Sequence, residues 1–273
     1  MNNIEKINVT AEEYKMQGEL LKASKEYNKI LDKDLDNINS RISLADIYYI
    51  LGDIEKSIEM YEKVIIIKPN YVSVLYRLGI CYFRATKFYK AIEVLGRVID
   101  LNTDLHMAYY WIALSYYHVG RINKSIEFFQ KLQEKNKNST LGFYHLAISY
   151  KAMGKYEKAI ECLKEILRED PNIVSVNYHL GESYLGLAEV KEALMCFKKV
   201  LDIDPEHRGA MDKMYTLIND QELMYTFGVE SALNEDDIDS LVSNYHIGEA
   251  YKGFASIEKA FKYFKQKNEK NKK

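Results

Sequence analysis

The sequence predicts an all-α solenoid built from antiparallel helix pairs, and three observations support this prediction. A tyrosine recurs every 34 residues over six cycles, small and large apolar residues recur in the same phase, and all three prolines occupy one position of the period. The tyrosines are Tyr14, Tyr48, Tyr82, Tyr116, Tyr150 and Tyr184. A fixed period of this length is typical of a stack of identical supersecondary units.

Each 34-residue unit contains the pattern of two helices. When the units are numbered from Ile4 and its equivalents, position 8 is alanine or glycine, position 20 is alanine or serine, and position 24 is tyrosine, phenylalanine or leucine. Positions 4, 7, 8 and 11 have the spacing of one helix face, and positions 20, 24 and 27 have that of a second. The small residues let the two backbones approach closely, and the side chain at position 24 fills the groove between them.

The turn within each unit is also predicted. Position 15 is glycine in four units, and glycine just past a helix end can adopt the left-handed conformation that ends the helix. Thr86 and Ala188 replace it in the other two complete turns, where we expect a less relaxed backbone. Asp53 is the expected N-cap of the following helix. Proline at position 32 lacks the N–H that would continue the second helix.

This pattern resembles the tetratricopeptide repeat family, which has a large apolar residue at position 4, leucine at 7, small residues at 8 and 20, tyrosine at 11, an aromatic residue at 24 and proline at 32. Position 32 departs from the pattern in three units, and position 7 is Thr10 in the first. The resemblance implies a right-handed superhelix whose first helices line the concave face. The matching units are 4–37, 38–71, 72–105, 106–139, 140–173 and 174–207.

The repeat pattern weakens after His207. Residues Arg208 to Asn219 still have the pattern of a helix, and Gly248, Tyr251 and Phe264 match positions 8, 11 and 24 of a further unit. A solenoid needs a terminal element that covers its last hydrophobic edge. We therefore interpret residues 1–207 as six tandem repeats and residues 208–273 as a degenerate repeat followed by a C-terminal capping repeat with a basic tail.

Charge and hydropathy indicate the compartment and exclude some partners. The formal net charge is −2, with both signs mixed along the chain, so there is no general attraction for nucleic acids or anionic membranes. No apolar stretch has the length of a membrane span, and the first residues do not resemble a secretion signal. We expect a cytoplasmic protein with no nucleic-acid partner and no membrane insertion.

Motifs of catalysis and cofactor binding are missing from the sequence. There is no GxxxxGK[ST] phosphate loop, no GxSxG, no HExxH and no CxxC. Asp32, Asp34 and Asp36 resemble the start of a calcium loop, but Asn37 and Ser43 stand where that loop requires glycine and glutamate. We therefore expect neither enzymatic activity nor a cofactor.

Histidine and cysteine spacing does not indicate a metal site. His145 and His179 occupy position 6 of neighbouring units, but two ligands without a third nearby make a poor site. Cys81, Cys162 and Cys196 form no short pair motif, and we interpret them as small core residues in a reducing compartment.

The concave surface is the candidate binding site. The family resemblance implies that positions 2, 5, 6, 9, 12 and 13 face it, and position 9 is aliphatic in the third to fifth units. Exposed apolar strips with polar rims usually mark partner sites, and Trp, Tyr and Arg dominate binding hot spots. The predicted partner-binding residues are Tyr76, Arg77, Ile80, Arg84, Tyr110, Trp111, Leu114, Tyr117, Tyr144, His145, Ile148 and Lys151.

The sequence thus predicts a scaffold or adaptor that binds an extended peptide or an amphipathic helix of another protein. No unit has the Lys/Asn pair at positions 5 and 9 with which some family members hold a C-terminal carboxylate. Arg77, Arg84 and Lys151 could instead orient one acidic group on an otherwise apolar ligand. Several alternatives stay open. They are a regulator switched by a peptide, a structural subunit that forms homo-oligomers, a groove filled by the chain's own C-terminal helices, and tyrosines that only pack on neighbouring units.

Overall fold

The structure, a computed structural model, describes residues 3–102, 104–137 and 139–219, and all regular structure within them is α-helical. Two compact units meet in sequence between Gly142 and Phe143. The first helices of the pairs are α1 (Asn3–Met16), α3 (Ile38–Ile50), α5 (Val72–Arg84), α7 (His106–His118), α9 (Thr140–Ala152), α11 (Val174–Gly186) and α13 (Arg208–Asn219). The second helices are α2 (Leu20–Leu31), α4 (Ile54–Ile67), α6 (Phe88–Leu101), α8 (Ile122–Lys135), α10 (Tyr156–Glu169) and α12 (Val190–Ile203).

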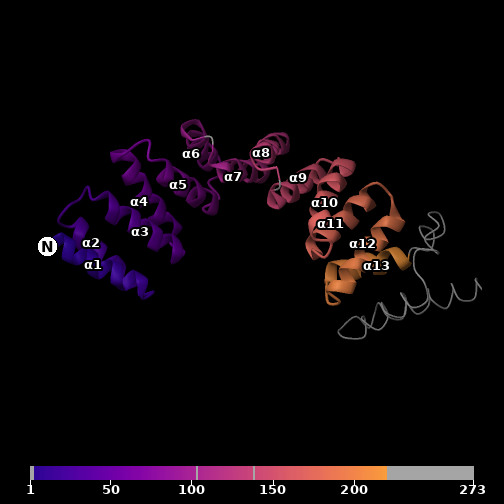
Figure 1. The fold of residues 1–273 in the computed structure, drawn as a ribbon, viewed down its shortest axis with the longest axis horizontal. Coiled ribbons are helices and arrows are strands. Elements are labelled where there is room, and N and C mark those ends of the chain that lie inside the picture. The colour runs from indigo at the N-terminus through magenta and orange to yellow at the C-terminus, as the bar shows by residue number, and fades with distance from the viewer. Residues whose placement is uncertain (1–2, 103, 138, 220–273) are drawn as a thin grey trace, which may run out of the picture. The chain divides into compact units, whose positions relative to one another are not determined.

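The helices follow the period of the sequence. From Ile38 to Arg208, the first helices of successive pairs begin 34 residues apart. Consecutive helices pack on one another from α1 to α8 in the first unit and from α10 to α13 in the second (Figure 1). In the first unit α5 also contacts α7, so first helices of neighbouring pairs lie side by side. This arrangement confirms the predicted class of all-α helix-pair repeats.

The two helices of a pair approach closely where the sequence places its small residues. A Cβ atom added to Gly79 would lie 2.4 Å from Leu95 Cγ, and one added to Gly181 would lie 2.7 Å from the ring of Phe197. The side chains of Tyr61 and Phe129, at position 24, are almost completely buried. The predicted packing of a large side chain against a small residue is therefore confirmed.

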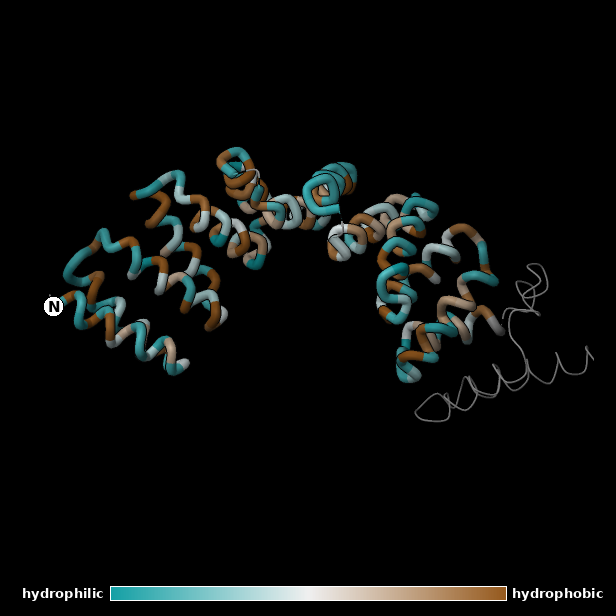
Figure 2. Tube along the Cα trace, in the orientation of Figure 1, coloured by the Kyte–Doolittle hydropathy of each residue, from teal (hydrophilic) through white to brown (hydrophobic). Residues whose placement is uncertain are grey.

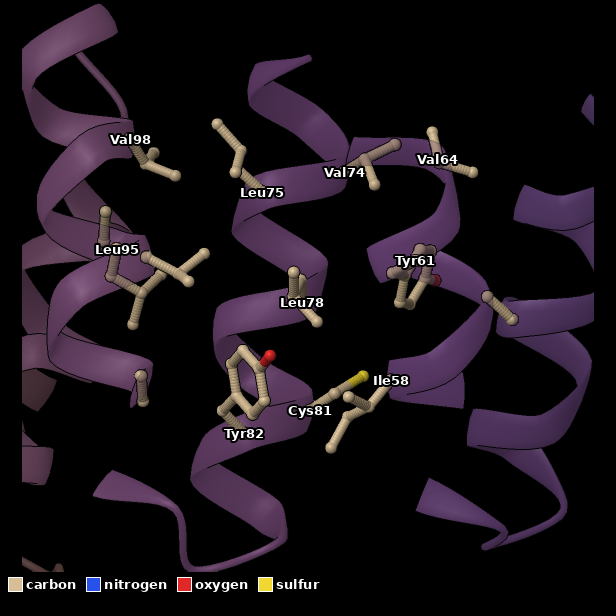
Figure 3. Packing of buried hydrophobic residues seen from close by; sticks show 14 of the residues in the cluster. Ile58, Tyr61, Val64, Val74, Leu75, Leu78, Cys81, Tyr82, Leu95 and Val98 are labelled. Atoms are coloured by element: carbon tan, nitrogen blue, oxygen red, sulfur yellow. The ribbon is translucent and has the colours of Figure 1, made fainter. Parts of the chain in front are cut away.

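The hydrophobic core runs from one pair to the next. In Figure 3, Leu75, Leu78 and Tyr82 of α5 lie between side chains of α4 and side chains of α6. One cluster of buried residues extends from Ala45 to Ile112 and so joins three successive pairs. Each pair therefore buries its apolar side chains only against its neighbours, as expected for a repeat protein.

A hydrogen-bonded turn ends the first helix of each of the six pairs. The N–H at position 16 donates to the carbonyl oxygen of the position-11 tyrosine, for example from Asp53 to Tyr48 at 2.9 Å, and the residue between them has a positive φ. This is the Schellman geometry that favours glycine. Asp53 then caps α4 by accepting a hydrogen bond from Lys56 N at 3.3 Å, as predicted.

Polar and apolar residues alternate along the helices of both units (Figure 2). Among the described residues, no helix combines the length and hydropathy that crossing a membrane requires. The helix expected at Arg208 is present as α13. The capping repeat and basic tail fall in residues 220–273, outside the described part of the chain, so the division at residue 207 stays a prediction.

The turns at Thr86 and Ala188 place residues other than glycine in the left-handed region. Their φ values are 58° and 59°, where a Cβ atom is strained, whereas the equivalent Gly52 has a φ of 84°. We expect Thr86→Gly and Ala188→Gly each to raise the free energy of unfolding by about 0.5 to 1 kcal/mol, and Gly52→Ala to lower it by about 1 kcal/mol. Urea unfolding followed by far-UV circular dichroism measures these differences. A loss of stability in both glycine variants would contradict the assigned strain.

Candidate functional site

Six ring side chains lie on α3, α5, the start of α6, and α7 in the first unit, and five of them contact one another. We call this surface the aromatic platform, and its members are Tyr49, Tyr76, Phe83, Phe88, Trp111 and His118. Phe83 is central, because its ring centroid lies 5.1 Å from that of Trp111 and 5.5 Å from those of Phe88 and His118. Phe88 and His118 are stacked, with centroids 4.9 Å apart. Trp111 Nε1 donates a hydrogen bond to Tyr76 Oη over 3.2 Å.

The platform is only partly covered. Five of its side chains are half-buried, and His118 is exposed. Ile80 and Leu114, the aliphatic residues at position 9 of α5 and α7, are also half-buried. They are therefore not sealed between the helices of their pairs, and they present part of their apolar surface on the first helices.

Tyr110 and Tyr117 have different surroundings from each other. Tyr110 is only 8% exposed, and its ring packs against those of Trp111 and Phe129. Burial raises the pKa of its phenol. Tyr110 therefore packs against Trp111 and exposes little of its own surface to solvent. Tyr117, by contrast, is half-buried beside His118.

Arg77 is held by an acidic residue of the preceding repeat. Asp46 of α3 forms an ion pair with Arg77 of α5 and also accepts a hydrogen bond from the hydroxyl of Tyr61. Burial and the hydrogen bond to Asp46 raise the pKa of Tyr61, and the hydrogen bond to Asp46 raises the pKa of Arg77. The guanidinium of Arg77, which the sequence predicts to face a ligand, thus pairs with a half-buried carboxylate of the same chain and stays exposed.

In five of the six units, position 9 is acidic where position 24 is tyrosine and aliphatic where position 24 lacks a hydroxyl. Asp46 accepts the hydroxyl of Tyr61, and Glu12 accepts that of Tyr27. Position 24 lacks a hydroxyl in the third to fifth units, and position 9 is aliphatic there. A buried hydroxyl needs an acceptor, so the carboxylates have a structural cause. The aliphatic side chains at position 9 are therefore partly explained by the absence of that hydroxyl, and not only by a partner.

Arg84 differs from the other predicted cations of the site. Its guanidinium carbon lies over the ring of Tyr49, 4.4 Å from the centroid, and its side chain is exposed. Within the part of the chain that the structure describes, Arg84 makes no ion pair and no side-chain hydrogen bond. Its charge remains available at the edge of the aromatic platform.

Lys151, a predicted site residue of the second unit, belongs to a polar cluster. We call Lys151 of α9 with His179 and Glu182 of α11 the Lys151 cluster. Glu182 forms an ion pair with Lys151 and lies 2.9 Å from His179 Nδ1. The hydrogen bond with His179, opposed by burial and supported by Lys151, lowers the pKa of Glu182 to about 2. The Tyr144 ring lies against both His179 and His145.

The cluster explains why the sixth unit departs from the relation between positions 9 and 24. Glu182 faces Lys151 and His179, so its carboxylate does not depend on a hydroxyl at position 24. Lys151 is consequently committed to an internal partner, as Arg77 is. Ile148, at position 9 of α9, is half-buried.

Sequence reasoning missed several residues of the platform. Tyr49, Phe83 and His118 lie at positions predicted to face the groove. Their contacts now distinguish them, because Phe83 contacts Trp111 and His118, and Tyr49 contacts Arg84. Phe88 gave no separate signal, because it begins a second helix at position 17, where every unit has an apolar residue. Only the packing of α5, α6 and α7 reveals its stacking on His118.

The described histidine and cysteine side chains do not form a metal site. Among the described residues, no group of three or more His, Cys, Asp or Glu side chains could hold a metal ion. Cys81, Cys162 and Cys196 are free thiols. Burial raises the pKa of Cys162 and of Cys196 to about 11, so both are protonated at neutral pH.

The Lys151 cluster predicts a pH-dependent contribution to stability. Because the pKa of Glu182 falls from 4.5 to about 2 on folding, its contribution is complete above the unfolded pKa and is lost as pH falls through the folded pKa. We expect Glu182→Gln to lower the free energy of unfolding by on the order of 1 to 2 kcal/mol at neutral pH, and by much less near pH 2.

Urea unfolding of the wild type and of Glu182→Gln at a series of pH values measures this difference. Glu206→Gln, a change at an exposed carboxylate with no ion pair among the described residues, is the matched control. A difference between Glu182→Gln and the wild type that stays constant from neutral pH to low pH would contradict the assigned role of the carboxylate.

Family profiles match most of the helical region. Profiles described as TPR repeat and tetratricopeptide repeat match residues 45–85, 73–103 and 144–207. A profile described as anaphase-promoting complex, cyclosome, subunit 3 matches residues 96–166. A comparison with curated proteins gives no match.

Solved structures resemble the chain over most of their own length. The MamA protein is 26% identical, with a TM-score of 0.58, over 63% of this chain and 93% of MamA. The C-terminal part of a TPR repeat-containing protein from Cytophaga hutchinsonii is 16% identical, with a TM-score of 0.71, over 89% and 98% of the two chains. YrrB, described as a TPR protein with an unusual peptide-binding site, is 17% identical, with a TM-score of 0.59, over 68% and 96%. The last two likenesses show the fold alone.

Proposed function

Because the chain belongs to the tetratricopeptide repeat family, we propose that it is a non-enzymatic interaction scaffold that binds an extended peptide or an amphipathic helix of another protein. The proposed contact surface is the aromatic platform together with Ile80 and Leu114. In the second unit, Tyr144, His145 and Ile148 of α9 form a separate candidate surface beside the Lys151 cluster. Tyr110 supports the platform, and Arg77 and Lys151 stabilise contacts between repeats.

One observation carries this proposal: large rings from successive repeats contact one another and yet stay partly accessible. Phe83 of α5 touches Trp111 and His118 of α7, and none of the three is buried. Aromatic side chains of this kind supply large, rigid contact areas at a small cost in conformational entropy. Tryptophan and tyrosine are also the residues most often found at binding hot spots.

The strength of binding follows from the buried apolar area. Burial contributes about 25 cal/mol per Å² of apolar surface, and the ordering of the ligand opposes it. A partner that covers Phe83, Trp111, Ile80 and Leu114 is expected to bind with a dissociation constant on the order of micromolar.

A charged residue within this surface should weaken binding. We expect Leu114→Glu, and independently Ile80→Glu, to weaken the binding of peptides selected from a displayed random library by at least about tenfold, because a carboxylate would be buried against apolar groups. Ile66→Glu is the matched control, since Ile66 lies on the second helix α4 and is 79% exposed.

Fluorescence of Trp111, the only tryptophan of the chain, reports binding at the platform when tryptophan-free peptides are used. Far-UV circular dichroism shows whether each variant keeps its helices. Equal affinity of folded Leu114→Glu, Ile80→Glu and the wild type for the selected peptides would rule out the platform as the binding surface.

Self-association is the second candidate function, and exposed apolar residues on α1 and α3 favour it. Met16 is 83% exposed and Ile50 is 67% exposed, and both occupy position 13 of a first helix. Light scattering should then give a molar mass above that of one chain, and Ile50→Glu should return it to the monomer value. A monomer at all accessible concentrations would exclude this function.

A further inference from the structure

We infer that Arg84 makes the aromatic platform selective for peptides that carry a carboxylate close to a large apolar side chain. This inference rests on the proposed function, because it specifies the chemistry of the partner that binds the same surface.

Arg84 is the cation of the predicted site that remains uncommitted. Arg77 is paired with Asp46, and Lys151 is paired with Glu182. Within the described residues, Arg84 has no carboxylate partner. Helices α3 and α5 carry three guanidinium groups, those of Arg41, Arg77 and Arg84, against the one carboxylate of Asp46. This local excess of positive charge is complementary to an acidic ligand.

The position of Arg84 prepares it to bind a carboxylate. Its guanidinium lies over the Tyr49 ring, 4.4 Å from the centroid, and this contact restricts the long side chain before a ligand arrives. A guanidinium stacked on a ring keeps its N–H donors free at its edge, and its planar fork matches the two oxygens of a carboxylate. Less conformational entropy is then lost on binding.

Apolar surface lies within one helical turn of Arg84. Phe83 precedes it and joins the platform, and Ile80 lies one turn before it on α5. One turn of helix rises about 5.4 Å, and alternate residues of an extended peptide are about 6.5 Å apart. A peptide whose apolar side chain covers Ile80 or Phe83 would therefore place an acidic group on Arg84 from an adjacent residue or from the residue after it.

Selection from a displayed library of random peptides tests this inference on the full chain. We expect peptides selected on the wild type to be enriched in Asp or Glu beside large apolar residues, and peptides selected on Arg84→Gln to lose this enrichment. Each selected acidic peptide is then synthesised without tryptophan, together with its Asn or Gln counterpart. Trp111 fluorescence gives the affinity of both.

For the wild type, the acidic peptide should bind about tenfold more tightly than its neutral counterpart. For Arg84→Gln, the two peptides should bind equally, with the affinity of the neutral peptide. Arg84→Lys should recover only part of the difference, since lysine keeps the charge and loses the planar fork. Arg168→Gln, which removes an arginine that is 74% exposed on α10, should behave as the wild type.

The outcomes separate this inference from the proposed function. Suppose that the acidic peptide and its neutral counterpart both shift Trp111 emission and bind with equal affinity, to the wild type and to Arg84→Gln alike. This result would overturn the selectivity and leave the scaffold function intact. A failure to select any peptide that shifts Trp111 emission would overturn both. Selected sequences that resemble residues 220–273 would assign the platform to the chain's own C-terminal region. Trp111 emission that changes on dilution of the free chain would assign it to a second copy. Either assignment would overturn the inference.

Discussion

The close approach of the two helices in each pair is the constraint on which the rest of the structure depends. At Gly181 a single added Cβ atom would lie 2.7 Å from the Phe197 ring, so the two helices can be this close only where the first carries a small residue. The turn that follows the position-11 tyrosine then starts the second helix at a fixed register. Repetition of this register every 34 residues brings the same positions of α3, α5 and α7 into line. For this reason Arg84 lies over Tyr49, and Phe83 lies against Trp111.

Satisfaction of buried polar groups decides which charges remain on the surface. The hydroxyl of Tyr61 needs an acceptor, Asp46 supplies it, and Arg77 balances the charge of Asp46. In the second unit, Glu182 is balanced by Lys151 and His179. These ion pairs give Arg77 and Lys151 carboxylate partners within the chain. Arg84, which lies over the Tyr49 ring, has no carboxylate partner among the described residues, and we propose that it binds one on the ligand.

The fold could be predicted from the sequence because its determinants are local and are repeated six times. Gly52 ends α3 and Asp53 caps α4 through contacts with residues close by in the sequence. The same pattern recurs in each repeat, which makes it easy to recognise. The site was predicted less completely, because its members depend on neighbouring helices. The burial of Tyr110 against Phe129 requires the packing of α7 on α8, and Phe88 reaches the platform from a second helix. Periodicity identifies the face of a helix, but it does not identify the partner of each side chain.

Hydrogen–deuterium exchange of the full chain, with and without a selected peptide, tests the central claim most directly. The proposed ligand lies on the first helices of the first unit, against Phe83 and Trp111. We therefore expect protection on binding to be largest in α5 and α7, and small in the second helices α4 and α6. Protection concentrated in the second helices, or no protection in α5 and α7 at a peptide concentration that saturates the chain, would contradict it.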